Sequence, residues 1–236
     1  MRLDIDIVGK AFEGASGKRH EVLAKMRFSL AAGEVLVIVG PSGCGKSTLL
    51  RLLAGLDQQF EGTISRPPQL RIGMVFQEPR LLPWRSVEEN VRLTAPPVDE
   101  ARLSALFAAL DLNEHRSHFP GELSLGLARR VALARAFAVE PDLLILDEPL
   151  ASLDDALAAR MRDEIARFAA LQSRMTILVT HDLDDAARLG DRLIVLSERP
   201  ARILHVVPIA VPRAARSETE IARIRSELTH LNLAGK

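Results

Sequence analysis

Short, mostly apolar runs recur along the chain, at residues 35–39, 143–146, 176–180 and 193–197. A strand that is apolar at consecutive positions is buried on both faces, which is typical of parallel sheets. Segments with helical periodicity separate these runs. The pattern therefore predicts an α/β protein, with helices packed on a largely parallel sheet.

Amphipathic stretches predict where the helices lie. Leucines at positions 49, 50, 52 and 53 predict a helix directly after the first apolar run. Residues 99–112 and 124–139 are also helical in pattern, and residues 86–89 have the spacing of a helix capping box. Because this helical stretch lies between sheet-like segments, it predicts a helical subdomain over residues 80–139. The longest amphipathic helix is expected to bury Leu157, Met161, Ile165 and Phe168.

The two ends of the chain complete the predicted layout. Residues 2–8 and 22–30 are strand-like, with a glycine-rich connection, and another short strand is expected at 202–207. A last helix carries Ile221, Ile224, Leu228 and Leu231 on one side. We expect a single domain over residues 1–236, with a core at 1–79 and 140–212 and a C-terminal helix at 213–236.

Composition narrows the function classes. Lysine plus arginine and aspartate plus glutamate both number 31, so the formal net charge is zero and no basic face for nucleic acid is indicated. The N-terminal residues lack the apolar block of a signal peptide, and the apolar runs are too short to cross a bilayer. Any role at a membrane would be that of a peripheral subunit. The single cysteine, Cys44, excludes an internal disulfide and is typical of a reducing compartment.

A glycine-rich segment between the first apolar run and its helix matches the phosphate-loop pattern, Gly, four residues, Gly-Lys-Ser/Thr. The glycines let the backbone wrap a phosphate, and N–H groups of residues 43–48 point inward at a helix N-terminus. Lys46 supplies a cation for the β- and γ-phosphates, and the Ser47 hydroxyl can ligate Mg²⁺. The predicted nucleotide-binding residues here are Gly40, Pro41, Ser42, Gly43, Cys44, Gly45, Lys46, Ser47 and Thr48.

The thiol of Cys44 lies inside this predicted loop, beside a helix N-terminus that favours a thiolate. We expect a bulky maleimide on Cys44 to block nucleotide binding, and a bound nucleotide to protect the thiol.

Two acids, Asp147 and Glu148, end the apolar run at 143–146. A buried strand that ends in charge places it at the carboxyl edge of the sheet, where ligands bind in open α/β folds. We expect Asp147 to hold Mg²⁺, directly or through water, and Glu148 to act as the general base on the attacking water.

Further motifs make the pattern specific. Residues 123–127, Leu-Ser-Leu-Gly-Leu, open a basic helix, residues 149–154 follow the acid pair, Gln77 follows a strand-like stretch, and His181 ends another. Together with the phosphate loop and the acid pair, these are six motifs in the order found in ABC ATPases. The chain resembles that family over essentially its whole length.

The resemblance implies a fold and an assembly. The fold would be a P-loop NTPase with a largely parallel core sheet, an N-terminal antiparallel β subdomain and an inserted α-helical subdomain. Two copies would enclose MgATP head to tail, so that Ser124, the N–H of Gly126, and Asp154 act across the homodimer. ATP would join the two copies, and hydrolysis would let them part.

The resemblance also implies roles for single residues. Gln77 would sense Mg²⁺ and the attacking water, and His181 would hydrogen-bond the γ-phosphate. Phe12 matches the aromatic residue that stacks on adenine, or else belongs to the core. The metal set would be Ser47, Gln77 and Asp147. Leu125 replaces the first glycine of the family's signature, and its side chain either crowds the nucleotide or points away from it.

Residues 75–84 and the segment from 198 to 213 resemble importer ATPases for nitrate, sulfonates and taurine. That resemblance implies a homodimer at the cytoplasmic face of the membrane, integral permease subunits as partners and, indirectly, a solute-binding protein. Leu81, Leu82 and Trp84 would form the permease docking site, or else belong to the subdomain core. The rival classes are an exporter ATPase, a non-transport ABC ATPase and a P-loop kinase.

Overall fold

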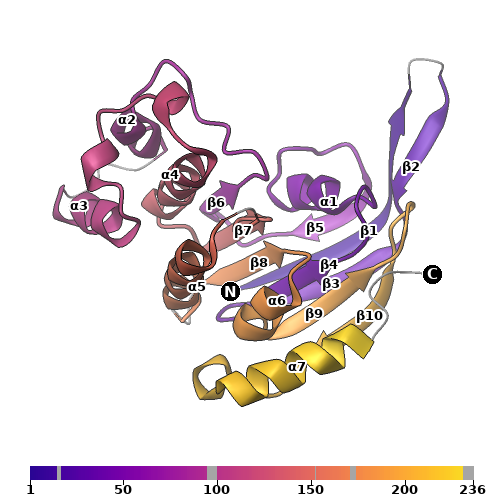
Figure 1. Ribbon diagram of the computed structural model, residues 1–236. Coiled ribbons are helices and arrows are strands. Elements are labelled where there is room, and N and C mark those ends of the chain that lie inside the picture. The colour runs from indigo at the N-terminus through magenta and orange to yellow at the C-terminus, as the bar shows by residue number, and fades with distance from the viewer. Residues whose placement is uncertain (15–16, 95–99, 152, 171–173, 231–236) are drawn as a thin grey trace.

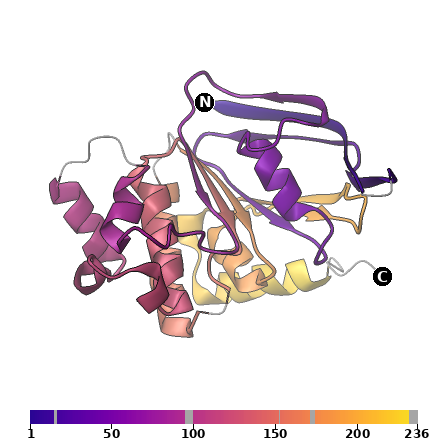
Figure 2. The same ribbon diagram turned by 90° about the horizontal axis from the view of Figure 1, so that it is seen from above.

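The computed structural model describes residues 1–14, 17–94, 100–151, 153–170 and 174–230. Over these residues the strands form two sheets, with α1 (Lys46–Leu53) lying between them (Figure 2). The larger is the core sheet, in the order β10-β9-β4-β8-β7-β6. Its strands are β4 (Val35–Val39), β6 (Ile72–Val75), β7 (Leu143–Asp147), β8 (Met175–Val179), β9 (Arg192–Leu196) and β10 (Ile203–Pro208).

The core sheet is parallel from β9 to β6, and only β10 pairs antiparallel. The four predicted apolar runs are β4, β7, β8 and β9, and β4, β7 and β8 are buried at every position. The predicted α/β class with a largely parallel core is therefore confirmed.

The smaller, N-terminal sheet is antiparallel, as the resemblance implied. Its central strand β1 pairs with all three others (Figure 1). The strands are β1 (Arg2–Glu13), β2 (Arg19–Leu23), β3 (Met26–Ala31) and β5 (Glu61–Ser65).

In this sheet one strand prediction is wrong, and one strand was not predicted. The single strand expected at 22–30 is split, because β2 pairs with the end of β1 and β3 with its beginning, and the backbone N–H of Ala24 bonds instead to the carbonyl of Ala201. Strand β5 was not predicted. None of its residues is fully buried, so it has no apolar run or alternation to reveal it.

Residues on alternate positions of the core strands fill two separate cores. Leu36 and Ile38 face the N-terminal sheet and the leucines of α1, whereas Val35, Val37 and Val39 face the helices on the other side. Every side chain of β4 is therefore buried, which explains the continuous apolar run in the sequence.

The segment between β6 and β7 is helical and stands beside the core sheet (Figure 1). The capping box at Ser86 is confirmed, since the Ser86 hydroxyl accepts from the Glu89 N–H and the Glu89 carboxylate accepts from the Ser86 N–H. The helices here are α2 (Val87–Arg92), α3 (Glu100–Ala109) and α4 (Leu125–Ala138), with one-turn helices at Asn113–His115 and Pro120–Glu122.

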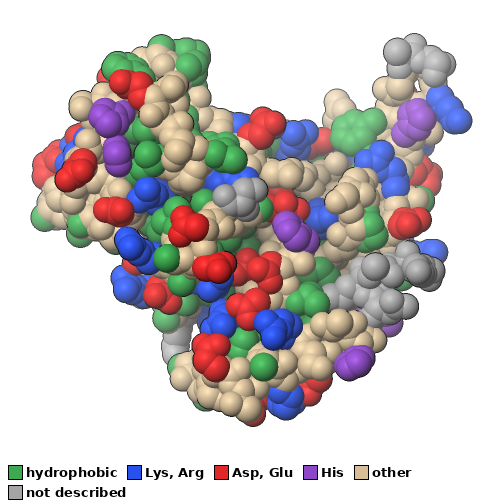
Figure 3. Space-filling view, viewed as in Figure 1, with side chains coloured by type: hydrophobic (Ala, Val, Ile, Leu, Met, Phe, Trp, Pro, Cys, Tyr) green, Lys and Arg blue, Asp and Glu red, His purple; other side chains and the backbone are tan. Residues whose placement is uncertain are grey.

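Three more helices cover the second core: α5 (Asp155–Ala169), α6 (Leu183–Leu189) and α7 (Glu218–His230). Met161, Ile165 and Phe168 of α5 are buried, as predicted, whereas Leu157 is only half-buried. Ile221, Ile224 and Leu228 of α7 are buried too, while Leu231 lies outside the described residues. None of the described helices is both long and apolar enough to cross a bilayer. Acidic and basic side chains are interspersed over the face shown in Figure 3.

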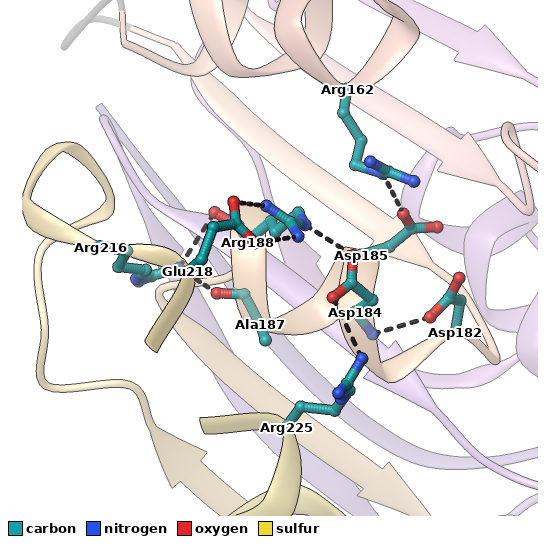
Figure 4. Close-up of polar contacts among 9 residues, drawn as sticks. All are labelled: Arg162, Asp182, Asp184, Asp185, Ala187, Arg188, Arg216, Glu218 and Arg225. Carbon is teal, nitrogen blue, oxygen red and sulfur yellow. Dashed lines mark hydrogen bonds and ion pairs between the residues drawn. The ribbon is translucent and has the colours of Figure 1, made fainter. Parts of the chain in front are cut away.

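A polar network joins α6 to α7 and α5 (Figure 4). Arg188 of α6 donates two hydrogen bonds of 2.7 Å to the Glu218 carboxylate, and Arg216 donates to the carbonyls of Ala187, Arg188 and Gly190 at the end of α6. From α5, Arg162 pairs at 2.7 Å with the buried Asp185. These contacts hold α6, the helix that follows His181, in place on the core.

Candidate active site

The carboxyl ends of five neighbouring parallel strands carry the candidate chemistry. In sheet order, β9 leads to Arg199, β4 to the phosphate loop, β8 to His181, β7 to Asp147 and Glu148, and β6 to Gln77. This edge is where ligands bind in open α/β sheets. An open pocket of about 230 Å³ lies there, lined by Ser42, Gly43, Gly45, Lys46, Ser47, Thr48, Gln77, Asp147, Glu148 and Arg199.

The phosphate loop is shaped by its neighbours. Gly45, the residue before α1, has φ 127°, and a Cβ there would lie 2.9 Å from side-chain carbons of Val22 and Leu23. Both its conformation and its contact with β2 therefore require glycine. The Lys46 amine donates to the carbonyls of Gly40 and Pro41, at 2.8 and 2.9 Å. This leaves the amine within the loop, in reach of an anion bound there.

Cys44 corrects one expectation. Its side chain is only 2% exposed and packs in the apolar core beneath the loop, and its N–H donates to the Pro41 carbonyl at 3.3 Å. The thiol therefore faces the core rather than the pocket. A maleimide cannot reach it in the folded chain, so the predicted nucleotide protection does not apply.

Asp147 ends β7 and is 5% exposed. Burial raises the pKa of its carboxyl group above the ordinary range, and the neighbouring charge of Glu148 acts in the same direction. A hydrogen bond from the Ser47 hydroxyl and the charge of Lys46 oppose the rise in this pKa. Asp147 is thus a buried acid whose carboxyl group accepts a hydrogen bond from the Ser47 hydroxyl.

Glu148 has a left-handed backbone, with φ 49°. Such a conformation is unfavourable for a non-glycine residue and is commonly found at functional sites. Its N–H donates to the carbonyl of Val179 on β8. This places the Glu148 side chain beside His181, with 3.6 Å between Oε2 and Nδ1.

Gln77 lies on the exposed loop after β6 and lines the phosphate pocket together with Ser47 and Asp147. The half-buried Arg135 side chain of α4 donates to the carbonyls of Pro79 and Arg80, at 2.8 and 2.9 Å. The loop that carries Gln77 is therefore bonded directly to α4, the helix that begins within the signature segment at Leu125.

Arg199 is a pocket residue that the sequence reasoning did not select. Its guanidinium donates to the Gly43 carbonyl at 2.8 Å. In the sequence, Arg199 is a basic residue two positions beyond the predicted strand at 193–197. The segment from 198 to 213 indicated only a resemblance to importer ATPases, not a pocket residue.

Phe12 is not among the residues of the phosphate pocket. It is 43% exposed on β1, opposite His20 of β2, and borders a separate hollow with Phe60 and Arg19. One face of its ring carries the Lys10 amine, 4.5 Å from the ring centre. Phe12 is thus an exposed aromatic residue outside the core, so the core alternative is wrong and the adenine role stays a prediction.

The signature segment forms the start of α4. Ser124 caps the helix by accepting from the Leu127 N–H at 3.2 Å, and Leu125 is 52% exposed. Gly126 is half-buried, and an ideal Cβ there would lie 3.6 Å from side-chain carbons of Leu153 and Leu157. Asp154 caps α5 in the same way, accepting from the Leu157 N–H at 2.9 Å. Ser152, between these motifs, lies outside the described residues.

The three predicted docking residues lie in different environments. Leu81 packs against the core, Trp84 is 68% exposed, and Leu82 borders a largely apolar groove of about 410 Å³. The sequence reasoning missed Leu56 and Leu93, which line the same groove and are exposed by 62% and 54%. The groove lies between α4 and the end of α1, and the Gln77 loop forms part of its wall through Phe76 and Arg80.

Known proteins similar to this chain belong to the family that its sequence motifs resemble. Residues 23–151 match the ABC transporter family model. The chain is 40% identical to the aliphatic sulfonates import ATP-binding protein SsuB 2 of Pseudomonas syringae pv. tomato, over 98% of this chain and 99% of that protein. It is 38% identical to SsuB of Bacillus subtilis, over 90% and 88%, and 42% identical to SsuB 1 of Pseudomonas aeruginosa, over 90% and 92%.

Two solved structures have the same fold. A bacterial ABC transporter cassette, solved as a dimer, matches with a TM-score of 0.79 and 25% identity, over 89% of this chain and all of that one. The same cassette in a post-hydrolysis state, bound to ADP and phosphate, matches with a TM-score of 0.77 at 24% identity. The phosphate loop, Gln77 and the Asp147–Glu148 pair line one pocket, as the resemblance implied. The family model and the near-full-length relatives show that this chain belongs to the ABC transporter family, as an ATP-hydrolysing subunit.

Proposed function

We propose that this chain powers an importer of aliphatic sulfonates, as a homodimer bound to the cytoplasmic face of the membrane permease. The observation that carries the proposal is the similarity, along nearly the whole chain, to proteins named as sulfonate import ATP-binding proteins in three organisms. The solute enters this proposal only through the relatives, because an ATPase subunit does not contact the solute.

The proposed chemistry uses the pocket residues in the roles that the resemblance implied. The phosphate loop and Lys46 bind the polyphosphate, since backbone N–H groups at a helix N-terminus and a cation both favour an anion. Glu148 takes the proton of the attacking water, and His181 holds the γ-phosphate. Ser124 and Gly126 of a second copy complete the site, so ATP bound to one copy joins the two copies.

Three oxygen-bearing side chains fit a magnesium ion. Ser47, Asp147 and Gln77 line one pocket, and the buried Asp147 carries a charge that a cation would neutralise. Mg²⁺ prefers a few oxygen ligands together with substrate phosphates. We therefore assign Ser47, Gln77 and Asp147 to Mg²⁺, which when bound would neutralise charge on the phosphates of ATP.

We assign the permease contact to the apolar groove that Leu82 borders and to the exposed Trp84, but not to Leu81, which packs against the core. The groove combines Leu82 with Leu56 and Leu93, and exposed apolar patches of this kind mark interaction sites. One of its walls is the loop of Gln77, which Arg135 bonds to α4. A permease segment bound in the groove would therefore contact both the Gln77 loop and α4, and its movement would displace both.

The test is reconstitution of this chain with its permease and solute-binding protein. We expect ATP hydrolysis to rise when the binding protein carries an alkanesulfonate, with nitrate and taurine as comparison solutes. Outward solute movement would favour an exporter ATPase, and hydrolysis that no permease stimulates would favour a non-transport ABC ATPase. Turnover that requires a phosphoryl acceptor would identify a kinase.

A further inference from the structure

We propose that Arg199 is a ligand of the nucleotide, binding the polyphosphate from the side of the pocket opposite Gln77. The proposal extends the known ATP binding of the family to a residue after β9, a strand that supplied none of the predicted site residues. It rests on the position of the Arg199 loop, on the present partner of the guanidinium and on the charge of its surroundings.

The Arg199 loop is held in place against the phosphate loop. Strands β9 and β4 are parallel neighbours, with Val39 paired to Val195, so the segments that follow them emerge side by side. Ala201 is fully buried, and its N–H and carbonyl bond to Val22 and Ala24 at the end of β2. Ser197 closes the turn, because its hydroxyl accepts from the Arg202 N–H at 3.0 Å.

The guanidinium of Arg199 has no acidic partner among the residues that the structure describes. It donates a hydrogen bond of 2.8 Å to the Gly43 carbonyl. Lys46, the established type of phosphate ligand, is bonded in the same manner to the carbonyls of Gly40 and Pro41. Both cations that line the pocket thus donate to carbonyls of the phosphate loop.

A phosphate is a better partner for Arg199 than a carbonyl. The guanidinium carries five N–H groups and a permanent charge, so it can keep the Gly43 carbonyl with one N–H and offer the others to phosphate oxygens. The pocket also contains the acids Asp147 and Glu148. A second cation beside Lys46 therefore counteracts repulsion between these acids and an incoming polyphosphate.

The experiment measures MgADP binding to the full chain, together with competition by inorganic pyrophosphate. We expect Arg199→Ala to raise both dissociation constants about 10- to 100-fold, as expected for loss of a hydrogen bond to a charged group. Arg199→Lys should recover part of the loss. Arg202→Ala removes an exposed arginine of the same turn that lies outside the pocket, and should bind like the unaltered chain.

Arg199→Gln separates a phosphate ligand from a mere support of the loop. Glutamine can still donate to the Gly43 carbonyl but carries no charge, so we expect it to bind MgADP as weakly as the alanine variant. Normal binding by Arg199→Gln, or by Arg199→Ala, would overturn the proposal. Lys46→Ala should abolish binding, which verifies the pocket itself and keeps a failure at Arg199 distinct from a failure of nucleotide binding.

Discussion

The Nδ1 atom of His181 lies 3.6 Å from the Oε2 atom of Glu148, although the two residues follow different strands. The Glu148 side chain is 20% exposed and that of His181 is 71% exposed. The histidine can therefore turn away while the glutamate stays beside Asp147. A γ-phosphate that takes the histidine as its partner would leave the Glu148 carboxylate free for water.

Glu148→Gln should keep MgATP binding but reduce hydrolysis by ~10²–10⁴-fold, the usual effect of removing a general base. Glutamine has nearly the same shape but cannot accept the proton. Phosphate release and nucleotide binding are measured on the same preparation. Glu114→Gln, at an exposed glutamate of the helical subdomain, is the control and should be unaffected. Near-normal turnover of Glu148→Gln would exclude Glu148 as the base.

Leu125→Gly, made in the Glu148→Gln background, should strengthen ATP-dependent dimerisation. Leu125 is half exposed at the start of α4, so its side chain must be accommodated when a second copy covers this helix end. Overpacking typically costs ~1–3 kcal/mol, or roughly 5- to 150-fold in the dimerisation constant. Sedimentation with and without MgATP measures the change.

Ser124→Arg is the opposite test of the same surface. A large cation in place of the capping hydroxyl should prevent dimerisation, while each monomer still binds ATP. If Leu125→Gly dimerises no better than its parent, the leucine points away from the phosphates and the crowding idea fails. Circular dichroism must show that α4 persists, because glycine lowers helix stability.

Leu93→Asp should weaken assembly with the permease without weakening ATP binding. It places a charge in the apolar groove, where the Leu93 side chain is 54% exposed. Trp84→Ala should also leave the fold intact and reduce assembly. Copurification with the permease is the measurement, and Leu204→Asp, at an exposed leucine of β10, is the matched control. Equal recovery of all three variants would remove the groove and Trp84 from the docking surface.

Asp147→Asn should stabilise the nucleotide-free chain at neutral pH while abolishing Mg²⁺-dependent hydrolysis. Because burial raises the Asp147 pKa in the folded state, the folded chain binds more protons than the unfolded chain between the ordinary and the raised pKa. Asp147 therefore makes the free energy of unfolding fall as pH rises through that window. Urea unfolding from pH 4 to 8 should show a shallower fall for the variant. Parallel curves for the two proteins would contradict the assignment.

Much of this protein follows from the sequence alone. The phosphate loop, the acid pair and the capping box depend on spacing within a few residues, and the buried strands depend on continuous apolar runs. Such local patterns can be recognised in the sequence without knowledge of any long-range contact. They predicted the α/β fold, the parallel core and the residues that line most of the phosphate pocket.

Other features depended on which segments meet in space. The split of residues 22–30 and the edge strand β5 follow from pairing with β1, and an exposed strand carries no apolar signal. The direction of the Cys44 thiol depends on core packing, and the groove joins Leu56, Leu82 and Leu93 from separate parts of the chain.

Sheet order decided the rest of the site. In the sequence, Gln77, Glu148, His181 and Arg199 are separated by long stretches, and nothing local states which strands are neighbours. Only the order β9-β4-β8-β7-β6 brings their loops to one edge around the phosphate loop. The sequence by itself determined the chemical groups of this ATPase, and the tertiary structure decided their arrangement, because strand order is set by long-range packing and hydrogen bonding rather than by local spacing.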